Sequence, residues 1–279
     1  QTAISSALLA GELNAGDITV NQVDAVKAAG YKITFNPLTA VGGLLFLDRA
    51  GTVQPALRDA RVRRAINMAF DRKQYVAKLL GGAGAANDEI VGKGTPAYLD
   101  GLAGEYPYDP AAAKKLLADA GYPDGFTVKM PSTFLSTTFE PSITQSLADI
   151  GITVKWKTVP SQEIVTSLYT KQYPMAFWMV GAGFVQRDLE GMFAPGGFVN
   201  VFNPSEPELN ALFTKAGLAS LKDAPAAYQD INRFLTKNAY SAPIFSMGSY
   251  KATKDGVKFT GMGKRNPLVS SLRAYTVED

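Results

Sequence analysis

The sequence predicts an α/β fold with a mixed, mainly parallel sheet flanked by helices. Apolar and polar residues alternate at residues 126–130 and 152–156, as in half-buried strands, and residues 175–180 form a fully apolar run typical of a buried strand. Helical patterns at residues 137–149 and 161–172 separate these three strands. Strands joined by single helices imply right-handed crossovers, and crossovers of this kind produce parallel pairing.

Three well-marked helices precede this region. Asp59 is a capping residue before an apolar stripe that runs to Phe70, and Asp71 starts a second helix that stops at Gly81-Gly82. Asp109-Pro110 starts a third, with Asp as the cap and Pro at the first helical position, and Gly121 ends it. We expect the basic cluster from Arg58 to Arg64 to form the solvated face of the first of these helices.

The other elements follow from similar local signals. Asn36-Pro37 and Gly42-Gly43 indicate a turn-prone connector, and residues 81–96 read as a Gly/Ala-rich loop. Asp88-Glu89 lies in that loop, where a solvated role is expected. The remaining predicted elements are a helix at 3–13, a strand, helix and strand within 18–35, a buried strand at 44–47, helices at 207–218 and 225–238, and a strand at 243–247.

Composition excludes several classes of function. The chain has 279 residues, 46% hydrophobic and 19% charged, which suits a globular protein of one large or two ordinary domains. It contains no cysteine and no histidine, so thiol catalysis, disulfides, thiolate metal sites and a Ser-His-Asp triad are excluded, and no cofactor is indicated. The net charge of +3 is scattered, without the basic and aromatic clusters typical of nucleic-acid binding. No apolar run reaches the length of a membrane span.

Two sequence motifs in the helical region resemble those of a known family. The run D-x-R-V-R-R-A-I-x-x-A-x-D-R from Asp59, and the run Y-x-Y-D-P-x-x-A-K-K-L-L-A-x-A-G-Y-P-D-G from Tyr106, resemble the peptide/nickel family (family 5) of solute-binding proteins. These are extracytoplasmic receptors of bacterial ABC importers. Residues 7–18 and 241–251 are similar to further segments of the family. The resemblance implies a periplasmic-binding-protein-like lobe and a binding protein rather than an enzyme.

The resemblance also implies an organisation. It covers roughly the C-terminal half of a family member, so we expect residues 1–40 to be a remnant of the first lobe and the approach to the hinge. Residues 41–240 would form the second lobe, and residues 241–279 the return crossing and closing segment of the first. The implied partners are a small-molecule or peptide ligand, an ABC transporter permease and the missing N-terminal lobe. The implied location is extracytoplasmic, with the signal sequence on the missing part.

The candidate ligand site follows the third predicted strand. Ligands of open α/β sheets bind beyond the C-terminal ends of strands, and here Trp178 and Gly181 lead into a loop that carries Phe184, Arg187 and Asp188. In peptide binders of the family, an acidic residue in this segment meets the ligand's amino group. Phe184 occupies the position expected for the acid, and Asp188 lies four residues later.

Each candidate also has a structural interpretation. Trp178 could equally be a core residue, whereas Trp156, on an alternating strand, is expected to pack in the core. Arg187 and Asp188 could form a surface ion pair. Asn200 matches the family pattern G-G-x-x-N, where it would contact ligand or cap a turn.

Two other classes of function stay open. A hydrolase could use carboxylates on this scaffold, but no pair of carboxylates has a telling spacing in the sequence. A protein-interaction domain is the other alternative.

Overall fold

The computed structural model describes residues 2–181, 185–260 and 275–277, and it has the predicted α/β fold. A five-stranded sheet has the strand order β1-β7-β2-β6, with β3 also paired to β7, and two smaller sheets pair β4 with β5 and β8 with β9. The strands are β1 Ala15–Ile18, β2 Lys32–Phe46, β3 Gly84–Ala86, β4 Phe126–Ser132, β5 Ile152–Thr158, β6 Met175–Gly181, β7 Ser241–Thr253, β8 Val257–Phe259 and β9 Tyr275–Val277. The α-helices are α1 Thr2–Leu9, α2 Val23–Ala28, α3 Ala60–Met68, α4 Arg72–Leu79, α5 Pro110–Asp119, α6 Glu140–Ala148, α7 Ile164–Leu168, α8 Val185–Phe193, α9 Pro207–Gly217 and α10 Ala224–Lys237. Short 3-10 helices cover Val20–Gln22, Pro55–Arg58, Asp100–Leu102 and Ser161–Glu163.

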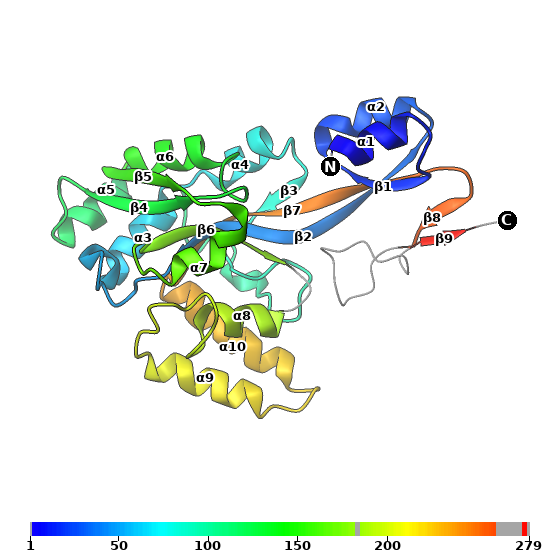
Figure 1. The fold of residues 1–279 in the computed structure, drawn as a ribbon. Coiled ribbons are helices and arrows are strands. Elements are labelled where there is room, and N and C mark those ends of the chain that lie inside the picture. Colours follow the sequence, from blue (N-terminus) through cyan, green and yellow to red (C-terminus); the bar gives the residue numbers. More distant parts are fainter. Residues whose placement is uncertain (1, 182–184, 261–274, 278–279) are drawn as a thin grey trace.

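Two long strands connect a larger part of the molecule to a small module (Figure 1). β2 and β7 pair in antiparallel fashion from Lys32 opposite Thr253 to Leu45 opposite Ser241. Their distal ends carry the module formed by α1, β1 and α2, which has its own small core around Leu8, Val26 and Tyr31. The chain therefore crosses between the two parts twice, on neighbouring strands.

The larger part has a hydrophobic core on each side of the sheet. One core combines side chains of α3, α4, α5 and α6, and the other combines side chains of α8, α9 and α10. β6 contributes to both, because Met175 and Phe177 belong to the first core while Ala176 and Val180 belong to the second. Burial on both faces explains why residues 175–180 are continuously apolar.

The three capped helices are confirmed. The Asp59 carboxylate accepts a hydrogen bond from the Arg61 backbone N–H (2.8 Å) and that of Asp109 from the Ala112 N–H (2.9 Å). The Asp71 carboxylate accepts from the Gln74 N–H at 3.0 Å. These short-range signals act within one helical turn, so the local sequence is sufficient to place each helix start.

The predicted predominance of parallel pairing is wrong. Within the described residues, β4 with β5 is the parallel pair, and the pairs of β1, β2, β3, β6 and β7 are antiparallel. β6 does lie beside β4, as the crossover implies, but it is hydrogen-bonded to β2. The five-stranded sheet is antiparallel because β2 lies between β6 and β7 and runs against both, whereas the parallel pairing of the βαβ unit lies in the separate sheet of β4 and β5.

The predicted connector between Asn36 and Gly43 is also wrong, because β2 continues through it. The register against β7 shifts between Asn36 and Ala40 and again between Gly42 and Gly43, so the turn signals mark irregularities within a strand. A Cβ atom at Gly42 would lie 2.5 Å from the Phe245 ring. Glycine inside a strand often marks such a close approach, here of a ring on the neighbouring strand. The predicted loop at 81–96 likewise contains a short strand, β3.

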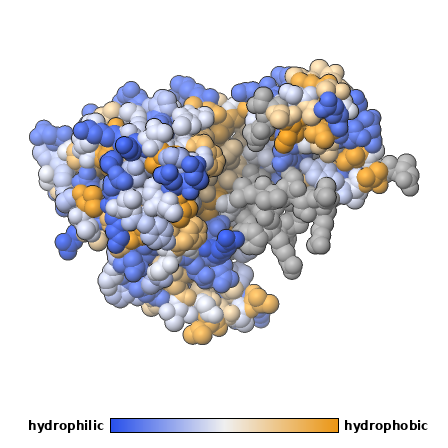
Figure 2. All heavy atoms as spheres, viewed as in Figure 1, coloured by the Kyte–Doolittle hydropathy of each residue, from blue (hydrophilic) through white to orange (hydrophobic). Residues whose placement is uncertain are grey.

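The surface gives two further observations. Apolar atoms are visible at the turn between α9 and α10 (Figure 2), where Leu218 is 84% and Leu221 is 98% exposed. Among the described residues, no helix combines the length and apolarity needed to cross a membrane, and no cluster of three acidic side chains could hold a metal ion.

Candidate functional site

β6 ends where the two long strands leave the larger part for the small module. Gly181, its last residue, is paired with Ala40 of β2, and Trp178 is paired with Gly43. From Ala40, β2 continues toward the module, which faces this end of the sheet (Figure 1). The C-terminal end of β6 is therefore the end that lies toward the small module.

The strands β4 and β5 end at the same edge. They are paired in parallel up to Ser132 opposite Thr158, and the Val159 N–H donates to the Ser132 carbonyl at 2.9 Å. Contacts along β6 indicate that it runs in the same direction. The Lys129 ammonium, in the middle of β4, lies 5.5 Å from the centre of the ring of Tyr173, which comes just before β6. Phe177, further along β6, stacks on the ring of Phe139, which follows the end of β4. The C-terminal ends of all three strands thus form one edge, the position where open α/β sheets bind ligands.

Trp178 is half-buried near this edge. It packs against the core formed with α8, α9 and α10, so part of the indole is held by the protein while part faces solvent. Trp156 is also half-buried, packs against the other core, and donates from Nε1 to the Thr144 hydroxyl at 2.9 Å. The two tryptophans therefore lie on opposite sides of the sheet.

Asp188 is a half-buried acid of this region. It lies in the first turn of α8, and burial raises the pKa of its carboxyl to about 6, although the nearby charge of Arg187 acts in the opposite direction. Arg187 is exposed, and no ion pair between the two appears among those of the described residues. Adjacent residues of a helix do not face each other, which explains why the alternative of a surface ion pair fails. A partly desolvated carboxylate of this kind would gain from a cationic partner.

Phe184 lies outside the described residues. Gly181 is the last residue of β6, immediately before them.

Asn200 is engaged within the chain. Its Nδ2 donates to the carbonyls of Phe193 (3.2 Å) and Ala194 (3.0 Å) at the end of α8, and its Oδ1 accepts from Arg49 at 3.2 Å. The side chain is 3% exposed. Gly196, in the same turn, has a φ of +74°. Asn200 thus has the turn-capping role that the sequence left open, and its polar atoms are not directed at the strand edge.

Sequence reasoning missed Phe134. This side chain follows β4 directly and is 65% exposed, at the same edge as the end of β6. The connection that carries it is ordered by Ser136, whose hydroxyl donates to Glu140 at 2.7 Å and accepts from the Thr133 N–H at 2.9 Å. A large apolar residue just beyond a strand was the signal that could have identified it.

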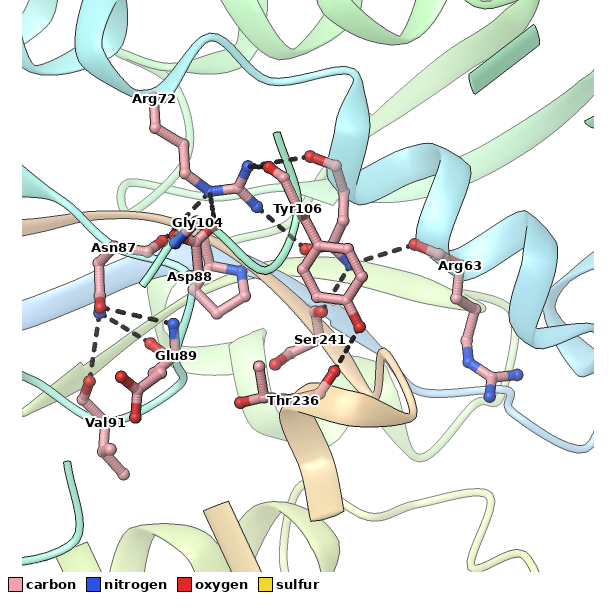
Figure 3. A network of polar contacts seen from close by, with 12 residues as sticks. Arg63, Arg72, Asn87, Asp88, Glu89, Val91, Gly104, Tyr106, Thr236 and Ser241 are labelled. Atoms are coloured by element: carbon pink, nitrogen blue, oxygen red, sulfur yellow. Dashed lines mark hydrogen bonds and ion pairs between the residues drawn. The ribbon is translucent and has the colours of Figure 1, made fainter. Parts of the chain in front are cut away.

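The arginines of the family motif that begins at Asp59 lie away from this edge, and two of them are buried. Arg63 was expected on a solvated face, but it is 6% exposed and donates to the backbone carbonyls of Leu57, Arg58, Asn238 and Ala239 at 2.7–3.0 Å. Arg72 donates to the Pro243 carbonyl of β7 at 2.9 Å and pairs with Asp88 at 3.2 Å (Figure 3). These arginines join α3 and α4 to elements more than 160 residues away in the sequence.

The prediction that Asp88 and Glu89 are solvated is wrong as well. Asp88 accepts from the Gly104 N–H at 2.8 Å in addition to its pairing with Arg72, and Glu89 is 0% exposed. Local turn signals could not show this burial because the partners are distant in sequence: Arg72 of α4 pairs with Asp88, and Asn232 of α10 contacts Glu89.

Comparison with known proteins identifies this architecture. Residues 1–194 match the family described as bacterial extracellular solute-binding proteins, family 5 middle. The chain is 25% identical over 218 residues to a probable di/tripeptide-binding protein of Pseudomonas aeruginosa, covering 74% of this chain and 41% of that protein.

Solved structures share the fold along the whole chain. The periplasmic binding protein DppA of Helicobacter pylori, in complex with the peptide STSA, matches with a TM-score of 0.83 and 20% identity over 100% of this chain and 55% of its own. NikA of Brucella suis, in complex with Fe(III)-EDTA, matches with a TM-score of 0.79 and 20% identity over 99% of this chain and 60% of its own. The chain therefore spans between two fifths and three fifths of the length of these relatives.

Proposed function

The chain belongs to family 5 of the bacterial extracellular solute-binding proteins, and we propose that it forms one side of the ligand cleft of an ABC importer receptor. The observation that carries this proposal is the shared edge at the ends of β4, β5 and β6, which faces the strands that cross to the small module. Receptors of this type close two lobes over a ligand, and closure biases the equilibrium toward the state that the transporter recognises.

The proposed domain arrangement assigns the larger part to the second lobe, at residues 41–240. Residues 1–40 and 241–279 then belong to the first lobe and its crossings. The pairing of β2 with β7 between the two parts supports this division, because both boundaries fall on the crossing strands. The rest of the first lobe would be supplied by a part of the receptor beyond this sequence.

The proposed ligand wall contains Trp178, Gly181, Phe134 and Asp188, with Arg187 beside it. Phe184 stays a candidate from the sequence alone. Half-buried or exposed aromatic side chains bury a large area at low cost in rotamer entropy, which suits a site for small organic solutes. Asp188 would pair with a cationic group such as the ammonium of a short peptide. The P. aeruginosa relative is named for di- and tripeptides, which makes these the first ligands to test.

The test compares the chain with the complete receptor by isothermal titration calorimetry against di- and tripeptides. We expect binding by the complete receptor and at least a hundredfold weaker binding by the 279-residue chain, because half a cleft cannot bury most of a ligand's surface. Micromolar affinity in the chain alone would contradict the proposal that it forms only one wall.

We propose an extracytoplasmic location and a transporter permease as the partner, as for other family members. A catalytic role is not part of the proposal, since the relatives reported above are binding proteins. Among the described residues, the two carboxyl groups with raised pKa values lie in different elements, Asp188 in α8 and Glu89 in the loop before α5. Clear hydrolysis of an ester or glycoside, abolished by Asp188→Asn, would instead support an enzyme.

A further inference from the structure

Glu89 is a buried acid that the proposed ligand site does not use. It lies in the loop of residues 87–105, which is hydrogen-bonded to Gln229 and Asn232 of α10, and its side chain is 0% exposed. In Figure 3 its carboxylate points away from the guanidinium of Arg72, which engages Asp88. A carboxyl group in this position needs either a charge partner or a proton.

The hydrogen bonds of Glu89 satisfy only one of its two oxygens. Oε2 accepts from the Leu99 backbone N–H at 3.0 Å and from Nδ2 of Asn232 on α10. Oε1 is buried without a hydrogen-bond partner among the described residues. The side-chain oxygen of Asn232 is in the same condition, although its Nδ2 also donates to the Ala97 carbonyl at 3.0 Å. Glu89 Oε1 and Asn232 Oδ1 are therefore two buried acceptors, and neither receives a hydrogen bond from a described residue.

A single proton removes this deficit. A carboxylic acid and a primary amide form a ring of two hydrogen bonds, in which the amide N–H donates to one carboxyl oxygen and the carboxyl O–H donates to the amide oxygen. The first bond of such a ring is present between Asn232 and Oε2. The second would join the two atoms that lack partners.

We propose that Glu89 is a neutral carboxylic acid in the folded chain and forms this two-bond ring with Asn232. The ring attaches the 87–105 loop to α10, and it opens when Glu89 loses its proton. The loop is thereby held by a contact that depends on pH, at a site separate from the proposed ligand wall.

The surroundings of Glu89 favour the neutral form. Burial raises the pKa of its carboxyl to about 7, while the bonds from Leu99 and Asn232 act in the opposite direction. The charged groups that act on it, Asp88 and Asp100, are both negative and disfavour its ionisation further. Asp88 is paired with Arg72 and Asp100 with the exposed Lys93, so neither cation is directed at Glu89.

Other groups packed nearby do not compensate for a charge. Tyr98, in the same loop, has a raised pKa because of burial and the nearby acids, and it stays neutral near pH 7. On α10, the amide of Asn232 meets Glu89, whereas Asp230 and Arg233 are exposed and paired with each other. The deprotonated form would therefore leave a buried charge with only two hydrogen bonds.

The direction of the pH effect follows from these pKa values. The folded chain keeps the proton up to about pH 7, whereas the unfolded chain loses it near pH 4.5. The unfolded state is therefore favoured progressively as the pH rises between these values, and stability falls.

Glu89→Gln is the decisive variant because glutamine can make both bonds of the ring and does not ionise. We expect it to match the wild-type chain near pH 5 and to have the higher melting temperature at pH 8. Glu140→Gln is the matched control, since Glu140 is a half-buried acceptor on α6 outside this loop, and its melting curves should follow the wild type at both pH values. The carboxyl carbon of Glu89, followed by NMR in the wild-type chain, should titrate near pH 7.

Exchange of the Leu99 amide hydrogen gives a local measurement. The ratio of its rate in the wild type to that in Glu89→Gln cancels the intrinsic pH dependence, and we expect this ratio to rise at least tenfold between pH 5.5 and 8.5. If Glu89 titrates near pH 4.5, or if Glu89→Gln is less stable than the wild type at both pH values, the carboxylate is bound as an anion by a water molecule or cation. Either result would overturn the proposal.

Discussion

Arg63 provides a sharp test of how this lobe is held together. Its guanidinium donates to the carbonyls of Leu57 and Arg58 before α3, and to those of Asn238 and Ala239 after α10. Arg63→Ala would leave these carbonyls without their donors in a site that is 6% exposed. Leaving a buried acceptor without its donor costs about 1–3 kcal/mol, so for these carbonyls together we expect a loss of about 3–5 kcal/mol. For a chain of this size, such a loss corresponds to a decrease in melting temperature of roughly 10 °C.

The neighbouring arginine is the matched control. Arg64 is exposed and donates to the Lys237 carbonyl at 3.1 Å, so Arg64→Ala should cost less than about 1 kcal/mol. Thermal and urea unfolding followed by circular dichroism would measure both variants. If the two arginine variants unfold within 1 °C of each other, water satisfies the buried carbonyls and the hydrogen bonds of Arg63 do not stabilise the fold.

Three further predictions concern the sheet and its edge. In the complete receptor, Trp178→Ala should weaken ligand binding by about 1–3 kcal/mol, whereas Trp156→Ala should leave affinity unchanged and lower stability by about 2–4 kcal/mol; calorimetry and melting curves would reveal a reversed assignment. Binding of a cationic ligand should weaken as the pH falls below about 6, because the ligand must displace the proton of Asp188, and Asp188→Asn should remove this dependence in titrations at pH 5 and 7. Gly43→Ala should lower the melting temperature strongly because its Cβ would lie 2.4 Å from the Ala242 carbonyl, while Gly217→Ala, which meets no atom within 4 Å, should not; equal melting temperatures would contradict the close approach of β2 and β7.

The sequence was most informative where structure depends on neighbours along the chain. The starts of α3, α4 and α5 depend on a capping aspartate and on the backbone N–H two or three residues later, so each signal lies within the predicted element. The apolar run at 175–180 also predicted β6 correctly, because burial on both faces leaves no polar position.

Prediction failed where the partner is distant in sequence. The glycines at 42 and 43 have the composition of a turn, but pairing with β7, about 200 residues later, keeps them in an extended strand. Arg63 adjoins the apolar stripe of α3, and its partners at Asn238 and Ala239 give no local signal. For both, tertiary contacts decide between two conformations or environments that the local sequence permits equally.

The candidate site shows the same division. The end of β6 and its glycine could be placed from the strand pattern, and so could Trp178. Phe134 could not be joined to them, because its position depends on the alignment of β4 beside β6. Asn200 fitted a family pattern, but the hydrogen bonds that occupy its amide involve Arg49 and the end of α8, which the pattern does not contain.

The residues that reveal the family are therefore different from those that would select a ligand. Arg63 and Arg72 fix α3 and α4 against α10 and β7, and this task is independent of the solute that is bound. Two structural neighbours with this fold are in complex with a peptide and with Fe(III)-EDTA, and one fold can carry different binding sites. Under the proposed function, the ligand of this chain is best sought by changing the residues of this edge. A substitution at Phe134 or Asp188 should alter ligand preference without a loss of stability. A substitution at Arg63 or Arg72 should lower stability without altering ligand preference.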